Sequence, residues 1–226
     1  MLRVPLLACV TSLAVIAAAS AGDVEPGFTP IFDGETLDGW TQKGGEAEYT
    51  VEDGMIVGKA VPNTPNSFLC TEKTYGDFEL RLEFQCDDRL NSGIMFRAQS
   101  SPDYKDGRVH GYQCEIDPSD RAASAGIYDE ARRGWLTPTK EEEGAFAKYK
   151  TRAGGYFKNG GWNEYIIRCE GDHITTTING LEGSDLIDAT DAEGFIGLQV
   201  HNIRGDEYPD PPMLVKWRNI RIKELK

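Results

Sequence analysis

Two short stretches of the sequence place polar side chains at every second position. In the first, Gln113, Glu115 and Asp117 alternate with apolar residues, and in the second Gln199 and His201 frame a valine. Side chains of a β-strand point alternately to its two faces, so each row would project from one side of a sheet. Carboxyl and imidazole groups on such a face can exchange protons with a ligand or bind a divalent cation. These five residues therefore form the centre of a candidate site, with Glu115, Asp117 and His201 as the candidates for holding a cation.

A third stretch adds a basic residue. Between Asn91 and Arg97 the same alternation groups Gly93, Met95 and Arg97 on one face. If this strand lies in the same sheet as the other two, Arg97 joins the polar rows. An equally simple interpretation is an ion pair between Arg97 and Glu115 on neighbouring strands, since facing opposite charges stabilise a sheet.

The elements that must carry these residues are β-strands. Residues 78–86 alternate apolar and polar side chains throughout, the pattern of a half-buried strand. Asp53-Gly54, Gly171-Asp172 and Asn179-Gly180 are tight-turn pairs between shorter β-prone runs. Many short strands with such turns predict an all-β sandwich or barrel. The shorter runs are residues 49–51, 55–57, 67–71, 94–97, 112–117, 164–169, 173–178, 195–201 and 215–222.

One segment, residues 129–161, departs from this pattern because it is rich in charge and glycine. Long connections in compact domains are often functional, so we expect one long loop here, with a short helix around residues 140–147. Tyr128, Trp135 and Trp162 flank or lie in this segment and offer flat faces for binding a ligand.

Trp40 and Trp217 are instead expected to pack in the core, because large aromatic side chains dominate the burial of apolar surface. The acidic run at residues 141–143 is expected to be solvated.

Composition excludes some classes of partner. The chain of 226 residues has a net charge of −13, which disfavours binding to nucleic acid because both molecules are anionic. Residues 4–19 form an apolar run after Arg3, and Ala19-Ser20-Ala21 has the small-x-small form that signal peptidase cleaves. We expect cleavage after Ala21, export to the periplasm or the cell exterior, and no membrane segment in the mature protein.

Removing residues 1–21, which contain one basic and no acidic residue, would change the net charge from −13 to −14. The remaining residues 22–226 fit one β-domain. Four cysteines, Cys70, Cys86, Cys114 and Cys169, would remain. They allow two disulfides in three pairings, or buried free thiols, which the apolar positions of Cys86 and Cys114 suit equally well.

Beyond single residues, a series of short motifs follows in a fixed order along the chain. The motifs are Phe32-Asp33-Gly34, Leu37-Asp38-Gly39-Trp40, Asp77-Phe78-Glu79-Leu80, residues 91–97, residues 111–117, Gly126-Ile127-Tyr128, Gly161-Trp162-Asn163, residues 197–201 and Arg218-Asn219-Ile220. In this order they resemble the 3-keto-disaccharide hydrolase domain family of the concanavalin A-like lectin/glucanase superfamily, common in exported bacterial proteins. The resemblance runs from about Phe28 to the end of the chain.

The resemblance implies a jelly-roll sandwich of two antiparallel sheets that holds a carbohydrate. It also implies cleavage of glycosides or disaccharides oxidised at carbon 3, by hydrolysis or by elimination. Many members carry Glu-x-Gln where this chain has Gln113-Cys114-Glu115, which moves the carboxylate one pleat along the strand.

The candidate groups have a use in such a reaction. A ketone at carbon 3 acidifies the proton at carbon 2, so a base can remove it while a donor holds the enolate oxygen. We expect His201 to be the base, since histidine titrates nearest neutrality, and Glu115 to be the second choice as base or acid. Arg97 or a bound cation would hold the enolate. The residues expected to bind the sugar are Gln113, Asp117, Tyr128, Trp135, Trp162 and Gln199.

Two other functions are compatible with the same residues. A laminarinase-type endo-glycosidase carries E-x-D-x-x-E, which Glu115-Ile116-Asp117-Pro118-Ser119-Asp120 approximates with an aspartate in the last position. A lectin-like carbohydrate-binding module would use the polar rows for binding alone, because the same sandwich serves both kinds of protein.

Overall fold

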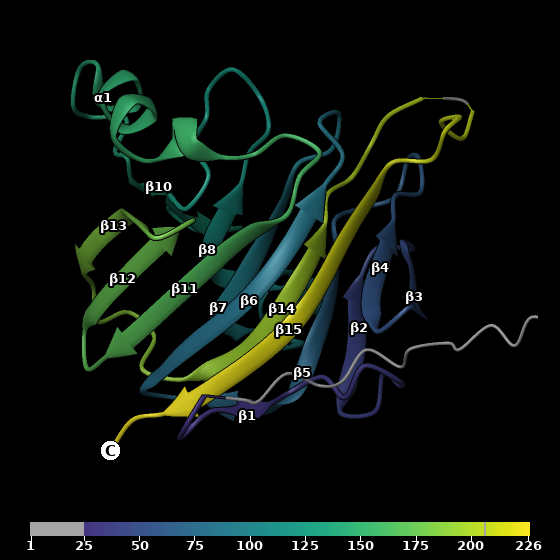
Figure 1. The fold of residues 1–226 in the computed structure, drawn as a ribbon, viewed down its shortest axis with the longest axis horizontal. Coiled ribbons are helices and arrows are strands. Elements are labelled where there is room, and N and C mark those ends of the chain that lie inside the picture. The colour runs from purple at the N-terminus through teal and green to yellow at the C-terminus, as the bar shows by residue number, and fades with distance from the viewer. Residues whose placement is uncertain (1–24, 206) are drawn as a thin grey trace, which may run out of the picture.

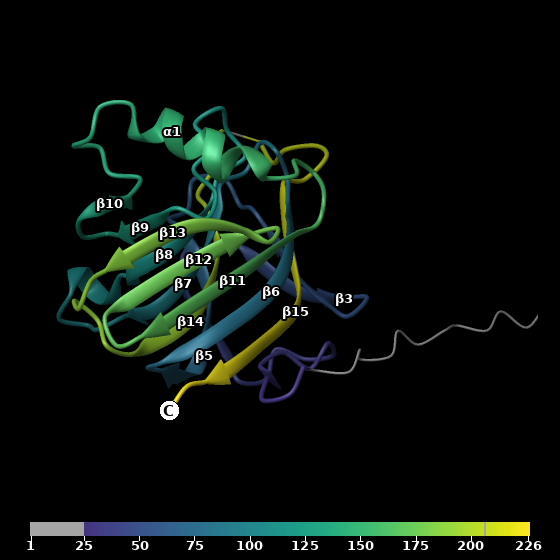
Figure 2. The ribbon, with the colours of Figure 1, turned by 60° about the vertical axis from the view of Figure 1, so that its left-hand side comes forward.

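The strands of this chain form two antiparallel sheets that pack face to face (Figures 1 and 2). A computed structural model of the protein describes residues 25–205 and 207–226. The expected signal segment, residues 1–21, lies outside the described residues. The all-β sandwich expected from the sequence is confirmed.

The first sheet has eight strands in the order β13-β12-β11-β6-β15-β4-β3, with β1 paired to β15. Their bounds are β1 Thr29–Pro30, β3 Glu48–Glu52, β4 Met55–Lys59, β6 Phe78–Cys86, β11 Asn163–Glu170, β12 His173–Ile178, β13 Leu181–Ile187 and β15 Leu214–Glu224.

The second sheet has seven strands in the order β10-β9-β8-β7-β14-β5-β2. Their bounds are β2 Trp40–Gly44, β5 Ser67–Tyr75, β7 Ser92–Gln99, β8 His110–Ile116, β9 Ile127–Glu130, β10 Gly134–Thr137 and β14 Gly194–Val200. All three stretches that carry the candidate chemistry therefore lie in this sheet.

The core lies between the sheets and follows from the alternation in the sequence. On β6, every second residue from Phe78 to Cys86 is buried and the residues between them are partly exposed. Tyr112, Cys114 and Ile116 of β8 belong to the same core cluster, as the alternation predicts. Their burial directs Gln113 and Glu115 to the outer face of the seven-stranded sheet.

Trp40 and Trp217 are buried, as expected from the sequence. The four cysteines in the described range are free and buried, and burial raises the pKa of the Cys70 and Cys169 thiols to about 12. Thiols in this state are poor nucleophiles, so they serve as packing groups.

The segment at residues 129–161 contains more structure than expected. Its first part forms a hairpin of β9 and β10, and a helix, α1, spans Ala145–Arg152, followed by a short turn, η2, at Gly154–Tyr156. The helix begins five residues later than its expected range because Gly144, directly before it, adopts a left-handed φ of 74°, which a right-handed helix cannot include. No helix in the described residues is long and apolar enough to span a membrane.

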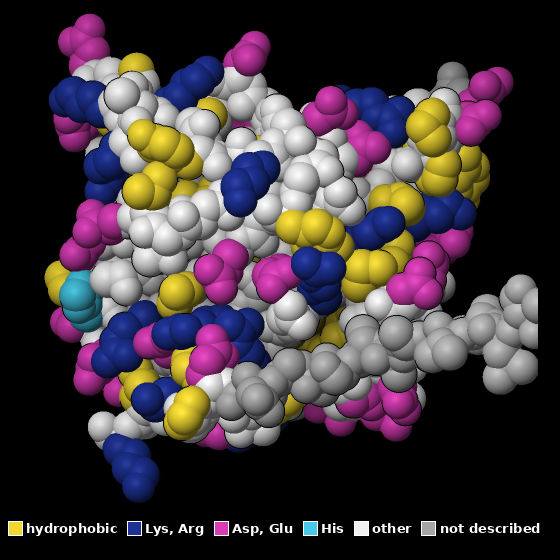
Figure 3. Space-filling view, in the orientation of Figure 1, with side chains coloured by type: hydrophobic (Ala, Val, Ile, Leu, Met, Phe, Trp, Pro, Cys, Tyr) yellow, Lys and Arg dark blue, Asp and Glu magenta, His cyan; other side chains and the backbone are white. Residues whose placement is uncertain are grey.

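The outer face of the eight-stranded sheet is occupied by ion pairs. Figure 3 shows basic and acidic side chains interleaved on this face, most densely at its lower left. Arg168 contacts both Glu79 and Glu170, and Arg218 contacts Glu83. These charged groups of the eight-stranded sheet therefore pair with one another across its outer face.

Candidate active site

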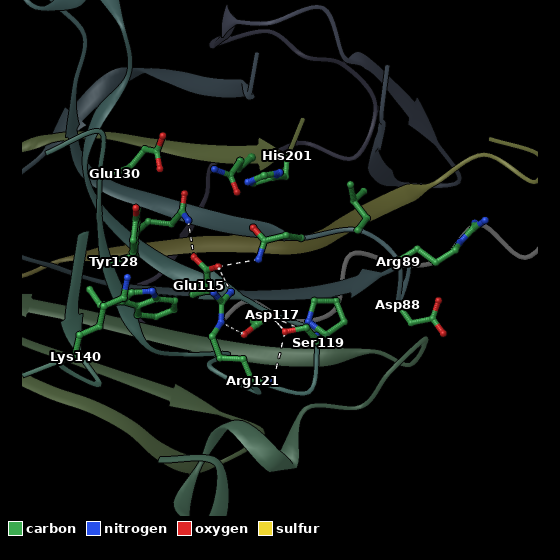
Figure 4. Close-up of a pocket in the computed structure, with 16 residues that line it drawn as sticks. Asp88, Arg89, Glu115, Asp117, Ser119, Arg121, Tyr128, Glu130, Lys140 and His201 are labelled. Atoms are coloured by element: carbon green, nitrogen blue, oxygen red, sulfur yellow. Dashed lines mark hydrogen bonds and ion pairs between the residues drawn. The ribbon is translucent and has the colours of Figure 1, made fainter. Parts of the chain in front are cut away.

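A pocket of about 580 Å³ opens on the outer face of the seven-stranded sheet. This volume lies in the range typical of sites for small molecules. Strands β8, β9, β10 and β14 contribute to it, together with the loops at residues 88–91 and 117–121 (Figure 4). The sequence-predicted residues that line it are Gln113, Glu115, Asp117, Tyr128, Trp135, Gln199 and His201. We call this cavity the first pocket.

Strand register brings the polar rows together. Gly93 of β7 pairs with Glu115 of β8 on one side and with Gln199 of β14 on the other. A Cβ atom on Gly93 would lie 2.5 Å from Cδ of Gln113. The glycine therefore leaves room for the side chain of Gln113 to lie across β7, between the two rows.

Glu115 is the buried carboxyl group of the pocket, with 4% of the residue exposed. Its Oε1 accepts a hydrogen bond from Asn91 Nδ2 at 2.7 Å, and its Oε2 accepts one from Gln113 Nε2 at 2.7 Å. Burial raises the pKa of Glu115 to about 7, although both donors and the nearby Arg121 oppose the shift. A carboxyl group that titrates near neutrality is suited to general acid or base catalysis.

Buried amide atoms with no protein partner line the same pocket. Among the described residues, Oε1 of Gln113 and both amide atoms of Gln199 make no hydrogen bond. Such groups are rare because leaving a buried polar atom unpaired costs about 1–3 kcal/mol. Their positions suit hydrogen bonds to the hydroxyl groups of a ligand.

Asp117 has a structural role in the loop that follows β8. Its carboxylate accepts hydrogen bonds from Ser119 Oγ at 2.6 Å, Ala123 N at 3.1 Å and Arg121 Nε at 2.7 Å. Burial opposes ionisation of Asp117, but these donors outweigh it, so the pKa is lowered. Its oxygens are engaged in folding the loop and presenting Arg121, and Asp117 also lines the first pocket, so its contact with a ligand stays a prediction.

Arg121 is a basic residue of the pocket that sequence reasoning missed. Its Nη2 lies 3.5 Å from Oε1 of Glu115, and its guanidinium lies 4.9 Å from the ring centre of Trp135. Figure 4 shows Arg121, Asp117 and Glu115 pointing toward one another. The available signal was its position four residues after Asp117, in a turn opened by Pro118.

His201 follows β14 directly and is half-buried at the edge of the first pocket. Its Nδ1 lies 2.9 Å from the carbonyl oxygen of Asn202. A carbonyl oxygen only accepts, so Nδ1 carries the proton and Nε2 is left for contact with a ligand. Tyr128 and Trp135 form the aromatic wall, with ring centres 5.3 Å apart in an edge-on arrangement.

The expectation that Arg97 joins the polar row is wrong. Its backbone adopts φ 45°, and the register of β7 with both neighbours shifts at this point. This bulge turns the side chain inward, where it donates to the carbonyl oxygens of Gly76 at 2.9 Å and Gly171 at 2.8 Å and pairs with Asp77 at 2.8 Å. Arg97 therefore joins turns at one end of the sandwich, and it does not pair with Glu115.

Trp162 also lies away from the first pocket. It directly precedes β11, which belongs to the eight-stranded sheet, and its ring packs 3.8 Å from the guanidinium of Arg218 on β15. Other residues missed from the sequence do line the pocket, since their roles depend on contacts between distant loops. They are Asp88, Arg89, Leu90, Asn91, Pro118, Ser119, Arg121, Glu130 and Lys140.

The candidate cation ligands do not fit a metal ion in this arrangement. The guanidinium of Arg121 already contacts both Glu115 and Asp117, where a cation would have to bind. Across residues 25–205 and 207–226, no group of three or more His, Cys, Asp or Glu side chains has the geometry to hold a metal ion. We therefore derive no chemical step through a cation.

Comparison with known proteins relates the chain to carbohydrate-active proteins. A family model for the 3-keto-alpha-glucoside-1,2-lyase-like domain matches residues 27–223. A 3-keto-disaccharide hydrolase of Bacteroides thetaiotaomicron is 35% identical over 253 residues, covering 88% of this chain and 79% of that protein.

Solved structures show the same fold at lower identity. A candidate glycosyl hydrolase from Parabacteroides distasonis aligns with a TM-score of 0.59 and 20% identity, over 88% of this chain and 94% of its own. The carbohydrate-binding module CBM66 from Bacillus subtilis aligns with a TM-score of 0.53 and 18% identity, over 82% of this chain and 96% of its own.

Proposed function

This chain belongs to the 3-keto-alpha-glucoside-1,2-lyase-like domain family, and from that premise we propose that it cleaves the glycosidic bond of 3-keto-glycosides in the first pocket. The observation that carries the proposal is Glu115. It is a buried carboxyl group with a pKa of about 7, held by two amide donors beside a guanidinium and unpaired amide atoms.

The proposed reaction is an elimination across carbons 1 and 2 of the oxidised sugar. A base removes the proton from carbon 2, and the electron pair passes to the carbon-3 oxygen as an enolate. The carbonyl then re-forms, a double bond forms between carbons 1 and 2, and the bond from carbon 1 to the leaving oxygen breaks. That oxygen takes a proton from an acid. Later addition of water to the double bond would make the overall change a hydrolysis.

The arrangement favours Glu115 as the base and His201 as the acid, the reverse of the roles expected from the sequence. Glu115 lies within the pocket and titrates near neutrality, so a substantial fraction is ionised under conditions where it must accept a proton. His201 lies at the edge of the pocket, where a leaving group would depart. The bond from Nδ1 to the carbonyl of Asn202 orients Nε2, and Nε2 would donate the proton from the imidazolium form of the ring.

The remaining groups would stabilise and orient the sugar. Arg121 takes the role expected of Arg97, because it is the guanidinium beside Glu115 and can hold the enolate oxygen. The unpaired amide atoms of Gln113 and Gln199 would bind sugar hydroxyls. Tyr128 and Trp135 supply the aromatic surface against which a pyranose ring would lie.

The test uses purified protein with two 3-keto-glucosides, one with an alkyl and one with a 4-nitrophenyl leaving group. We expect Glu115→Gln to lose activity on both, since both need the proton at carbon 2 removed. His201→Ala should lose activity on the alkyl glycoside and keep much of it on the nitrophenyl glycoside, whose anion leaves without an acid. The opposite pattern would restore His201 as the base.

Two controls separate the other functions. Turnover of unoxidised glucan would favour the laminarinase-type function, which the structure supports poorly because Asp120, its third acidic position, does not line the first pocket. Binding of the keto-sugar without turnover by wild type would favour a lectin-like module. Activity lost on adding a chelator and regained with a divalent metal would show that a cation takes part.

A further inference from the structure

A second pocket, of about 700 Å³, adjoins the first on the same face of the seven-stranded sheet. Tyr128, Glu130 and His201 line both pockets, so they form the boundary between them. The strand register runs across the same boundary, because Gln199 of β14 pairs with Gly93 on the side of the first pocket and with Phe68 of β5 on the other side. The two pockets thus adjoin on this face, with His201 among the residues at their junction.

The floor and rim of the second pocket differ in chemistry. Phe68 and Val109 belong to an apolar cluster on the outer face of the sheet, separate from the main core. Polar side chains surround these two residues. An apolar floor with a hydrogen-bonding rim suits a pyranose ring, which has an apolar face and hydroxyl groups at its edge. The polar rim residues are Asn66, Lys105, Asp106, Arg108, Glu130 and Asn202.

One wall of the second pocket is a loop between β7 and β8, residues 100–109, which crosses over the apolar cluster. Its turn at Lys105–Gly107 (η1) has three successive residues with positive φ, at 46°, 56° and 85°. Non-glycine residues rarely adopt this conformation, and strain of this kind gathers at ligand-binding segments. Hydrogen bonds from Tyr104 and Lys105 to the carbonyl oxygen of Ala131, at 2.8 Å and 2.6 Å, tie the turn to the β9–β10 hairpin.

The far wall is connected to the proposed acid. Asn66 Oδ1 accepts a hydrogen bond from the backbone N of Asn202 at 2.9 Å, and the carbonyl of Asn202 accepts one from Nδ1 of His201 at 2.9 Å. A ligand that contacts this wall therefore touches residues that are hydrogen-bonded to His201, and His201 also lines the first pocket.

We infer that the second pocket binds the sugar ring of the leaving group, so that a disaccharide spans both pockets with its scissile bond beside His201. This assignment rests on the proposed function. It names a site for the leaving sugar that is distinct from the residues that perform the elimination. The side chains of Arg108 and Asn202, which line different walls of the second pocket, would bind hydroxyl groups of that ring.

The experiment compares two substrates of one oxidised sugar, a 3-keto-disaccharide and the corresponding methyl 3-keto-glycoside. We expect Arg108→Ala and Arg108→Trp to lower kcat/KM for the disaccharide about tenfold or more, the effect of losing one good hydrogen bond or the space for a ring. Their kcat/KM for the methyl glycoside should stay within about twofold of wild type, which also shows that each variant is folded.

Lys140→Ala is the matched control, because Lys140 lines only the first pocket and should affect both substrates alike. Lys73→Ala, exposed and outside both pockets, should change neither. Equal losses on the two substrates in Arg108→Ala and Arg108→Trp, or no loss on either, would overturn the assignment.

If wild type cleaves neither substrate, the proposed function fails. Binding measurements then test separately whether the second pocket holds a sugar ring. Calorimetric titration should then show that the disaccharide binds wild type more tightly than the methyl glycoside and that Arg108→Trp removes the difference. Equal binding of the two ligands by wild type would overturn the assignment.

Discussion

At the scale of single residues, opposing effects on Glu115 set the conditions for activity. Burial favours the neutral form, whereas Asn91, Gln113 and Arg121 favour the carboxylate. The resulting pKa of about 7 leaves both forms populated near neutrality. The pKa of Glu115 is therefore sensitive to the loss of any one of these neighbours. Arg121 provides the clearest test because it contributes a full charge.

We predict that Arg121→Gln moves the acidic limb of the pH profile of kcat/KM to higher pH. Arg121 lowers the pKa of Glu115, so its removal raises that pKa, and the base form appears only at higher pH. Because Arg121 is partly exposed, we expect a shift of about half a unit to one unit, with a drop in kcat of about 100-fold from the lost enolate contact. Arg121→Lys keeps the charge and should shift the limb less. An unmoved limb in Arg121→Gln would contradict the proposed role of Glu115.

A second residue-scale prediction concerns Gly93. In Gly93→Ala the new Cβ would displace Gln113 and weaken its bond to Glu115, so we expect kcat/KM to fall about tenfold. The free energy of unfolding should change by no more than about 1 kcal/mol, since only the end of a flexible side chain must move. Gly76→Ala is the control, because its Cβ would lie 3.6 Å from the nearest atom outside its chain neighbours. Full activity in Gly93→Ala would show that Gln113 does not position Glu115.

At the scale of elements, an ion-pair network holds the β9–β10 hairpin against the rest of the fold. The carboxylate of Asp129, fully buried, pairs with both Arg132 and Arg133. Arg133 also lies 2.7 Å from Asp188, and Arg132 pairs with Asp191 in the same segment. This network fixes the strands that carry the aromatic wall of the first pocket.

We therefore predict that Arg133→Gln raises KM severalfold with a smaller effect on kcat. The hairpin would lose part of its anchor, and its aromatic residues would bind the sugar less well. The free energy of unfolding should fall by about 1 kcal/mol, since Arg133 itself is partly exposed. Arg168→Gln, which breaks ion pairs on the outer face of the other sheet, is the control and should leave KM unchanged. Thermal unfolding and initial rates measure both effects, and a fall in kcat alone would exclude this positioning role.

Elements also show what the sequence can and cannot predict. Regular alternation of apolar and polar residues is enough to locate β6, β8 and β14, and it correctly groups Glu115, Gln199 and His201 at one pocket. The same rule fails at Arg97, because a bulge adds a residue to β7 and turns the side chain to the other face. It also misses Arg121, whose place depends on the folding of an irregular loop around Asp117.

At the scale of the whole molecule, the outer faces of the two sheets differ in how their polar and charged groups are paired. The eight-stranded sheet neutralises its charges within its own surface, as Arg168 and Arg218 illustrate. The seven-stranded sheet instead buries Glu115 and leaves amide atoms of Gln199 unpaired among the described residues. Unpaired and desolvated groups reduce the stability of the fold, and the buried carboxyl group of Glu115 makes this a face through which pH acts on unfolding.

The pH dependence of global stability follows from the raised pKa of Glu115. The ordinary value of 4.5 applies in the unfolded chain and about 7 in the folded protein. Below pH 4.5 the group is protonated in both states. Between these values only the folded state keeps the proton, so stability is lost as the pH rises through the folded pKa, by about 3 kcal/mol in total.

Glu115→Gln removes this titration and keeps the shape of the side chain. We expect the free energy of unfolding of wild type, relative to this variant, to fall by about 3 kcal/mol between about pH 4.5 and pH 8. Urea denaturation of both proteins over this pH range measures the difference between their free energies of unfolding. The contributions of the other titrating groups are the same in both proteins and cancel in this difference. Parallel curves would show that Glu115 is not desolvated in the folded protein. A wild-type curve that falls relative to that of the variant as the pH rises would show that the carboxyl group proposed for catalysis lowers the stability of the fold near neutral pH.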